Sequence, residues 1–331
     1  MQCHFNGTRL IRVLPSLLGI EIILGLLING LALWIFCLHL KPWKSSTVLL
    51  FSLAMADFLL IMALPFRATY YWYRLNWIFG EALCNTCLFM LAMNRSGSIF
   101  FLMAIAVDRY MRVVHPHHAI NSMSVFKASL VALGIWIVTI AMTAHVFMSE
   151  HLILSSKHDN RTYCESFMVV ADRKTIMNWH KFEFLFSFYL PLLVILYCTI
   201  HIISHLRGRQ LAQHAKIKKA LGFMILVVVL FITCFLPSNL TQVAIWIKTS
   251  QLIRTRPESE VCEALEELTE GFYISISLTY LNSVLDPVVY YFSIPVFKNI
   301  CRKVLHLPQA EQTESTGKKT RETGSHSLSQ L

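Results

Sequence analysis

One arginine draws attention because it lies deep inside an apolar stretch of the chain. Arg95 is the only charged residue between Glu81 and Asp108. A guanidinium inside hydrocarbon is costly, so an ionisable residue at such a position indicates a functional site. Its planar fork of N–H donors matches a carboxylate through two parallel hydrogen bonds. Arg95 therefore predicts the binding of an anionic ligand. The alternative is a structural arginine paired with an internal acid such as Glu165.

The elements that position Arg95 are expected to cross a membrane. Of the 331 residues, 55% are apolar and 15% are charged, whereas a soluble domain has roughly 45–50% and about 25%. The excess gathers in runs of about twenty residues, each long enough to cross ~30 Å of hydrocarbon as a helix. This composition excludes disorder, collagen and a small disulfide scaffold, and it argues strongly against a soluble multidomain enzyme.

Seven such runs predict an all-α membrane protein with a seven-transmembrane-helix bundle. Helices are expected because lipid offers no partner to backbone polar groups, and the runs lack the alternation of barrel strands. An odd number of spans places the two termini on opposite sides. The expected spans are Leu14–Leu40, Thr47–Tyr73, Glu81–Met111, Ala128–Phe147, His180–His205, Lys219–Ile247 and Leu268–Phe292.

The distribution of charge predicts a multi-pass protein with an extracellular N-terminus. The net charge is +10, and cytoplasmic loops carry the excess of Lys and Arg. The sequons at Asn6 and Asn160 fall on the opposite, outer face, where N-glycosylation occurs. The basic residues that set this orientation are Lys41, Lys44, Arg109, Arg112, Lys127, Arg207, Arg209, Lys216, Lys218, Lys219, Lys298, Arg302 and Lys303.

These patterns divide the chain into four segments. Residues 1–13 form an extracellular N-terminus without a cleavable-signal pattern, and residues 14–292 form the membrane domain. Residues 293–305 suit a short amphipathic helix on the inner membrane surface, and residues 306–331 a disordered cytoplasmic tail. Cys301 in the short helix is either palmitoylated or a free thiol.

A series of short motifs follows in order along the spans: Asn29, Leu53–Asp57, Asp108-Arg109-Tyr110, Trp136, Pro191, Cys234–Pro237 and Asp286–Tyr290. Together they resemble the class A, rhodopsin-like G-protein-coupled receptors. Departures from the class pattern are Phe235 in place of Trp, Asp286 in place of Asn, and Ile217 in place of an acid that often pairs with Arg109. The last departure predicts that the resting contact of Arg109 comes mainly from Asp108. The resemblance implies roles in activation and G-protein coupling for Asp108, Arg109, Tyr110, Phe235, Pro237, Asp286, Pro287 and Tyr290.

Within that class, four segments resemble the hydroxycarboxylic acid receptors, and the related oxoeicosanoid receptor shares much of them. The segments are Met93–Ser98, Val113–His118, Cys164–Phe167 and Leu285–Phe292. The resemblance implies a plasma-membrane receptor for a small extracellular carboxylate that couples to inhibitory G proteins and lowers cyclic AMP. The alternative ligand is an oxidised fatty acid, with its carboxylate on the same arginine and its tail between helices.

The resemblance also implies which residues contact the ligand. Arg95 anchors the carboxylate. Arg67 steers the anion or binds a second acceptor, or else extends to the lipid headgroups. Glu165 accepts a ligand hydroxyl, orients an arginine, or is a solvated loop acid. Gln242 stands where lactate-type relatives carry an arginine, which puts lactate in doubt. The full set is Arg67, Arg95, Glu165, Ser166, Phe167, Gln242 and Tyr280.

Two covalent links and one ion site follow from the same resemblance. Cys84 and Cys164 match the pair that ties the third span to the second outer loop, and Cys3 and Cys262 are candidates for a second bridge. A sodium ion is expected as an allosteric ligand. Its implied site is Asp57, Ser98, Asn282 and Asp286. No other cofactor or metal is expected, and the spacing of His115, His117 and His118 is a poor match to a metal site.

Two other classes of function, a carboxylate transporter and an enzyme, fit the sequence less well than a receptor does. A carboxylate transporter would usually show repeated halves or broken helices, and neither is visible. An enzyme is remote because the sequence offers no nucleophile and base constellation. The expected partners are a heterotrimeric G protein, arrestin and membrane lipid, with no nucleic acid.

Overall fold

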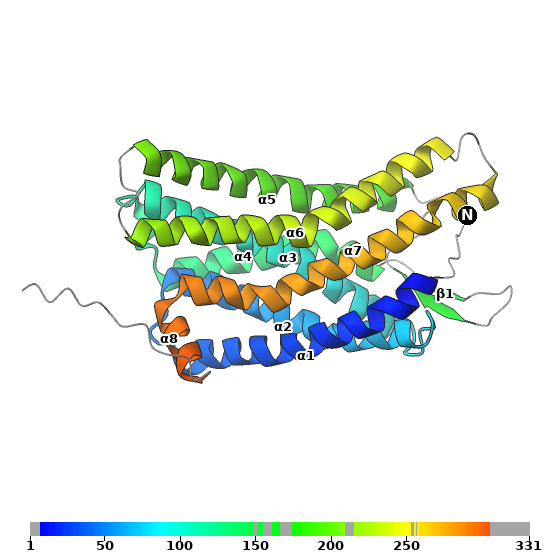
Figure 1. The fold of residues 1–331 in the computed structure, drawn as a ribbon, viewed down its shortest axis with the longest axis horizontal. Coiled ribbons are helices and arrows are strands. Elements are labelled where there is room, and N and C mark those ends of the chain that lie inside the picture. The colour runs from blue at the N-terminus through cyan, green and yellow to red at the C-terminus, as the bar shows by residue number, and fades with distance from the viewer. Residues whose placement is uncertain are drawn as a thin grey trace, which may run out of the picture.

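The fold is a bundle of long helices lying side by side, known from a computed structural model (Figure 1). The structure describes residues 7–148, 151–154, 161–165, 174–208, 215–252, 255 and 257–304. The bundle helices are α1 (Thr8–Leu38), α2 (Ser45–Trp72), α3 (Glu81–Val114), α4 (Val125–Met148), α5 (Lys174–Gly208), α6 (Ala215–Leu252) and α7 (Glu258–Ser293). A short helix α8 (Pro295–Val304) follows, and a 3₁₀ turn (Ala119–Ser122) joins α3 to α4.

Six of the helices, α1 to α6, are long and apolar enough to cross a membrane. The seventh, α7, packs along α6 and α1 in the same bundle, but its first turns carry Glu260, Glu263, Glu266 and Glu267. The predicted seven-helix architecture with a short following helix is confirmed. Large apolar side chains such as Leu27, Leu133 and Leu193 are more than half exposed, as expected for side chains that face lipid.

The helices extend further than the hydropathy pattern predicts. α1 begins at Thr8 rather than Leu14, α5 at Lys174 rather than His180, and α7 at Glu258 rather than Leu268. These additional turns are polar or charged. A hydropathy pattern detects only the part of a helix that matches hydrocarbon, whereas a helix continues wherever its backbone hydrogen bonds can form.

A two-stranded hairpin caps one end of the bundle, which we call the hairpin end, and the opposite end is the α8 end. β1 (Leu152–Leu154) pairs antiparallel with β2 (Thr162–Cys164), with Leu152 opposite Cys164. The hairpin was not expected from the sequence, because strands of three residues are too short to show an alternating pattern. The Trp77 amide joins the hairpin to the α2–α3 connection by donating to the Thr162 carbonyl at 2.7 Å.

Two apolar clusters divide the interior. One fills the hairpin half and includes Tyr70, Leu88 and Phe272. The other fills the α8 half and includes Phe36 and Phe231, and α8 packs against it through Phe297 and Cys301. Cys301 is buried in this cluster and forms no disulfide bond.

Candidate functional site

A cavity of about 60 Å³ lies in the hairpin half of the bundle, between α2, α3, α5 and α7. Its walls are mostly apolar side chains of α3 and α7. A volume of this size holds about four to six water-sized groups. Its polar and aromatic lining includes Arg67, Arg95, Glu183, Phe184, Tyr273 and Tyr280.

Arg95 of α3 is 5% exposed and lines this cavity. Its Nη1 donates to Ser187 Oγ of α5 at 3.3 Å, and its Nη2 donates to Asn239 Oδ1 of α6 at 3.1 Å. The Phe184 ring lies 3.9 Å from its guanidinium carbon, a cation–π contact. Its Nε has no hydrogen-bond partner among the described residues. The described contacts of the guanidinium are therefore with neutral groups, and its Nε–H remains available as a hydrogen-bond donor.

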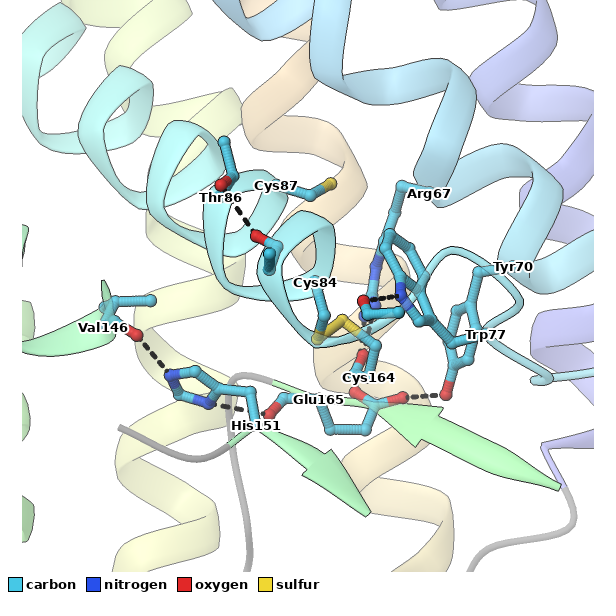
Figure 2. Close-up of a disulfide and its surroundings, with 12 residues drawn as sticks. Arg67, Tyr70, Trp77, Cys84, Thr86, Cys87, Val146, His151, Cys164 and Glu165 are labelled. Carbon is cyan, nitrogen blue, oxygen red and sulfur yellow. Dashed lines mark hydrogen bonds and ion pairs between the residues drawn. A yellow bond between two sulfur atoms is a disulfide. The ribbon is translucent and has the colours of Figure 1, made fainter. Parts of the chain in front are cut away.

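Arg67 of α2 is equally buried but differently partnered. Its Nη1 donates to the Cys164 carbonyl at 2.6 Å, and its Nη2 forms an ion pair with Glu165 at 3.3 Å (Figure 2). The rings of Tyr70 and Tyr71 lie 4.8 and 5.0 Å from its guanidinium carbon. With 4% exposure, Arg67 does not extend to the headgroups. Its charge is balanced inside the protein.

Glu165 follows the disulfide-bonded Cys164 and turns back toward α2. Besides Arg67, its carboxylate accepts hydrogen bonds from Tyr70 Oη at 2.6 Å and from Tyr273 Oη. These contacts occupy both carboxylate oxygens and give Glu165 the role of orienting an arginine. That arginine is Arg67 and not Arg95. The acid that attracts Arg95 electrostatically is Glu183 of α5, although no ion pair within 4.0 Å joins the two described side chains.

His151 at the start of the hairpin holds the same loop to α4. Its ring nitrogens lie 2.7 Å from the Val146 carbonyl and 3.1 Å from the Glu165 carbonyl (Figure 2). Burial lowers the pKa of His151 below its ordinary value, while the two carbonyl acceptors act in the opposite direction.

The other predicted ligand residues do not all meet at the cavity. Tyr280 lines it. Gln242 is fully buried on α6 but is not part of the lining, and neither of its amide atoms has a partner among the described residues. Ser166 and Phe167 lie outside the described residues.

A second polar cluster lies closer to the α8 end and contains the residues expected to bind sodium. Asn94 Nδ2 contacts Asp57 Oδ1 at 3.5 Å and Ser98 Oγ at 3.3 Å. Asn282 Nδ2 donates to Asp286 Oδ2 at 2.8 Å. All five side chains are buried, and one oxygen each of Asn282 and Asp286 has no partner among the described residues.

The remaining activation residues lie around this cluster and at the α8 end. Tyr290 donates to Asp57 Oδ2 at 3.1 Å. Pro237 and Pro287 lie inside α6 and α7, and Phe235 is buried one turn from Asn239. Tyr110 lies 3.2 Å from His115 through its hydroxyl.

The expected contact between Arg109 and Asp108 is present, but it is not the main contact of either side chain. Arg109 Nε lies 4.0 Å from Asp108, at the limit for an ion pair. Asp108 accepts closer hydrogen bonds, of 2.9–3.1 Å from Arg112 and of 2.9 Å from Ser46. Arg109 instead donates to Ser293 at the end of α7. The reason is helical geometry: Arg112 lies four residues after Asp108, on the same face of α3, and neighbours in sequence do not face each other.

The disulfides agree with the resemblance as far as the structure describes them. Cys84 and Cys164 are bonded, which ties α3 to β2 beside the cavity (Figure 2). Cys262 is disulfide-bonded, and its expected partner Cys3 lies outside the described residues. The expected glycosylation sites Asn6 and Asn160 also lie outside them. Among the described residues, no three His, Cys, Asp or Glu side chains gather as a metal site.

Sequence reasoning missed several residues at the cavity. Glu183 is the most informative, because an acid inside the apolar run of α5 is a signal of the same kind as Arg95. Ser187 and Asn239 gave no such signal, since small polar residues are common in membrane helices. Tyr273 reaches the site only through the packing of α7 against α2.

The chain was compared with known proteins. Residues 28–290 match the 7 transmembrane receptor (rhodopsin family). Human hydroxycarboxylic acid receptors 3 and 2 are each 47% identical over 297 residues, which cover 90% of this chain and 74% and 78% of those proteins. Human oxoeicosanoid receptor 1 is 38% identical over 315 residues, covering 94% of this chain and 77% of that receptor.

The matched family and these relatives are receptors and not enzymes. A multi-pass location in the plasma membrane, a small-molecule ligand and a G-protein partner follow for this chain at that general level. The chain therefore belongs to the rhodopsin family of seven-transmembrane G-protein-coupled receptors, in the group that contains the hydroxycarboxylic acid and oxoeicosanoid receptors.

Proposed function

We propose that this receptor is activated by a small extracellular carboxylate bound to Arg95, and that it couples to inhibitory G proteins and lowers cyclic AMP. The observation that carries the proposal is the difference between the two arginines at the cavity. Arg67 has an internal carboxylate at 3.3 Å. Among the described residues, Arg95 donates hydrogen bonds only to neutral acceptors and keeps an unused Nε donor. Two relatives are named hydroxycarboxylic acid receptors, which supports the ligand class.

The size of the cavity favours a short acid over an oxidised fatty acid. About 60 Å³ is enough for a few non-hydrogen atoms, and a long chain would need an additional path between helices. The same assay with short acids and oxidised fatty acids separates the two classes of ligand.

The contacts of Arg95 suggest how binding reaches the G protein. Asn239 accepts from Arg95 and donates through its Nδ2 to the Phe235 carbonyl at 2.7 Å, within one turn of Pro237. A ligand carboxylate competes with Asn239 for the guanidinium and so weakens the tie between α3 and α6. The ligand then favours an arrangement in which the α8 half of α6 swings outward about Pro237.

Orientation and ion binding complete the proposal. The N-terminus and the hairpin end face the outside of the cell, and the α8 end faces the G protein, with arrestin and anionic lipid as further partners of its basic segments. A sodium ion at Asp57, Ser98, Asn282 and Asp286 stabilises the resting state. The free oxygens of Asn282 and Asp286 fit this role, because a hard cation prefers oxygen ligands.

Replacement of Arg95 tests the ligand anchor. Arg95→Ala is expected to raise the half-maximal concentration of acid agonists by roughly thirtyfold or more, because the ligand carboxylate loses its buried partner. Arg95→Lys keeps the charge without the fork and should lie between Ala and wild type. The measurement is inhibition of cyclic AMP formation at matched surface expression. An unchanged dose response of Arg95→Ala would contradict the proposal.

A further inference from the structure

An acidic side chain faces the same cavity as Arg95 and has no assigned role. Glu183 of α5 is 4% exposed and lines the cavity. Its Oε1 accepts a hydrogen bond from Ser96 Oγ at 2.7 Å, and Ser96 is the residue after Arg95 on α3. The other carboxylate oxygen makes no hydrogen bond to a described residue. A buried carboxylate with one unused oxygen can accept a hydrogen bond from a ligand.

Two of the charged groups at the cavity form an ion pair with each other, and two do not. Arg67 is neutralised by Glu165 at 3.3 Å, which leaves Arg95 and Glu183 as the remaining cation and anion of the lining. Neither takes part in an ion pair within 4.0 Å among the described residues. Each is instead held by neutral hydroxyl or amide groups of the neighbouring helices. The cavity thus presents one positive and one negative group that are not bonded to each other.

This arrangement disfavours a simple carboxylate. An acid that binds Arg95 places a second negative charge near Glu183, and like charges in a poorly solvated site repel strongly. A ligand that carries its own positive charge removes this cost, because its ammonium group donates to the unused oxygen of Glu183. A hydroxyl group can donate the hydrogen bond but leaves the negative charges uncompensated.

We propose that Glu183 is a specificity-determining residue and that the ligand carries a protonated amine beside its carboxylate, as a small amino acid does. This inference rests on the proposed carboxylate contact at Arg95. The carboxylate of the ligand pairs with Arg95, and its ammonium group pairs with Glu183 across the cavity. No proton transfer or covalent step is involved.

A three-carbon series tests the inference in cells that express the full-length receptor. The probes are propanoate, its 2- and 3-hydroxy derivatives and its 2- and 3-amino derivatives, each measured by inhibition of cyclic AMP formation. At least one amino derivative is expected to be about tenfold or more potent than propanoate on the wild type. Glu183→Gln should reverse this order of potency, because Gln keeps the shape of the side chain without its charge. The potency of the amino derivative should fall about tenfold, and that of propanoate should rise about tenfold.

Controls separate this inference from the proposed function. Glu267→Gln removes the same charge from an exposed position paired with Arg9 and should leave the order of potency unchanged. Arg95→Ala should raise the half-maximal concentration of every member of the series by roughly thirtyfold or more. If Arg95→Ala weakens the responses in this way but Glu183→Gln keeps the wild-type order, Glu183 has only a structural role. That result overturns this inference and leaves the proposed function standing. If propanoate is at least as potent as both amino derivatives on the wild type, the inference is also overturned. A wild type that responds to no acid overturns both proposals.

Discussion

At the scale of single residues, what distinguishes the buried ionisable groups is whether each has a partner of opposite charge. Arg67 and Glu165 form a closed pair that holds the loop after β2 against α2. Arg95 and Glu183 lie on the wall of one cavity and attract each other electrostatically, but no ion pair within 4.0 Å joins either of them to a described residue. Separated buried charges are retained at a cost, so Arg95 and Glu183 are better candidates for contact with a ligand than Arg67 and Glu165.

The sodium proposal is tested at a single residue, Asp57. We expect sodium ions to lower agonist affinity on the wild type, because the ion binds the resting state better than the active one. Asp57→Asn removes the carboxylate that attracts the ion and should make agonist affinity independent of sodium. The measurement is agonist competition with sodium replaced by an organic cation at constant ionic strength. The same sodium effect in wild type and variant would exclude Asp57 as a ligand of the ion.

At the scale of elements, α6 contains both the residue that contacts Arg95 and a proline that interrupts the backbone hydrogen bonds of the helix. Pro237 has no amide hydrogen to bond within the helix. The Phe235 carbonyl, two residues before Pro237, accepts from Ser238 Oγ at 3.0 Å and from Asn239 Nδ2 at 2.7 Å. Asn239 therefore bonds both Arg95 of α3 and the backbone of α6 beside Pro237. A change at Arg95 can reach the hinge through this single side chain.

Loss of this tie is expected to raise basal signalling. Asn239→Leu removes the acceptor for Arg95, a hydrogen bond to a charged group that contributes about 1.5–3 kcal/mol, so the resting arrangement loses stability and basal cyclic AMP should fall. Thr241→Val is the matched control, because its hydroxyl bonds only within α6, to the Pro237 and Ser238 carbonyls. Basal cyclic AMP equal to that of wild type in Asn239→Leu would show that the tie does not hold the resting state.

At the scale of the whole molecule, polar sites follow one another along the bundle axis. The cavity with Arg95 lies in the hairpin half, the Asp57 cluster lies deeper, and Arg109 lies at the α8 end. All three are connected by α3, which passes from Cys84 to Arg112 through the centre of the bundle. Such a sequence of sites suits a receptor, since a helix rearrangement can link a ligand at one end to a G protein at the other.

The orientation of the whole molecule is directly measurable. The proposed orientation places the basic segments and the α8 end in the cytoplasm. An epitope tag before Met1 should then be stained by antibody on intact cells, whereas a tag after Leu331 should require permeabilised cells. Enzymatic removal of N-glycans should raise the mobility of the protein on a gel, and Asn6→Gln should reduce that shift. Staining of both tags on intact cells would contradict the assigned topology.

Much of the architecture follows from the sequence alone. The apolar runs are long enough to require helices across a membrane, and lipid allows few other structures, so the bundle and α8 were predictable. The position of Arg95 inside the bundle was predictable for a similar reason, since a charged side chain in such a run is expected to face the interior or a cavity. The ends of α1, α5 and α7 were not, because helices continue beyond the hydrocarbon that creates the pattern.

Only the tertiary structure decided which charged groups pair. Arg67 and Glu165 are far apart in the chain, and their ion pair exists because the Cys84–Cys164 bond and the hairpin bring the loop over α2. The packing of the helices leaves Gln242 out of the cavity lining and includes Glu183 in it. Whether a buried charge is neutralised depends on distances between side chains of different helices, and no periodicity within one helix contains that information.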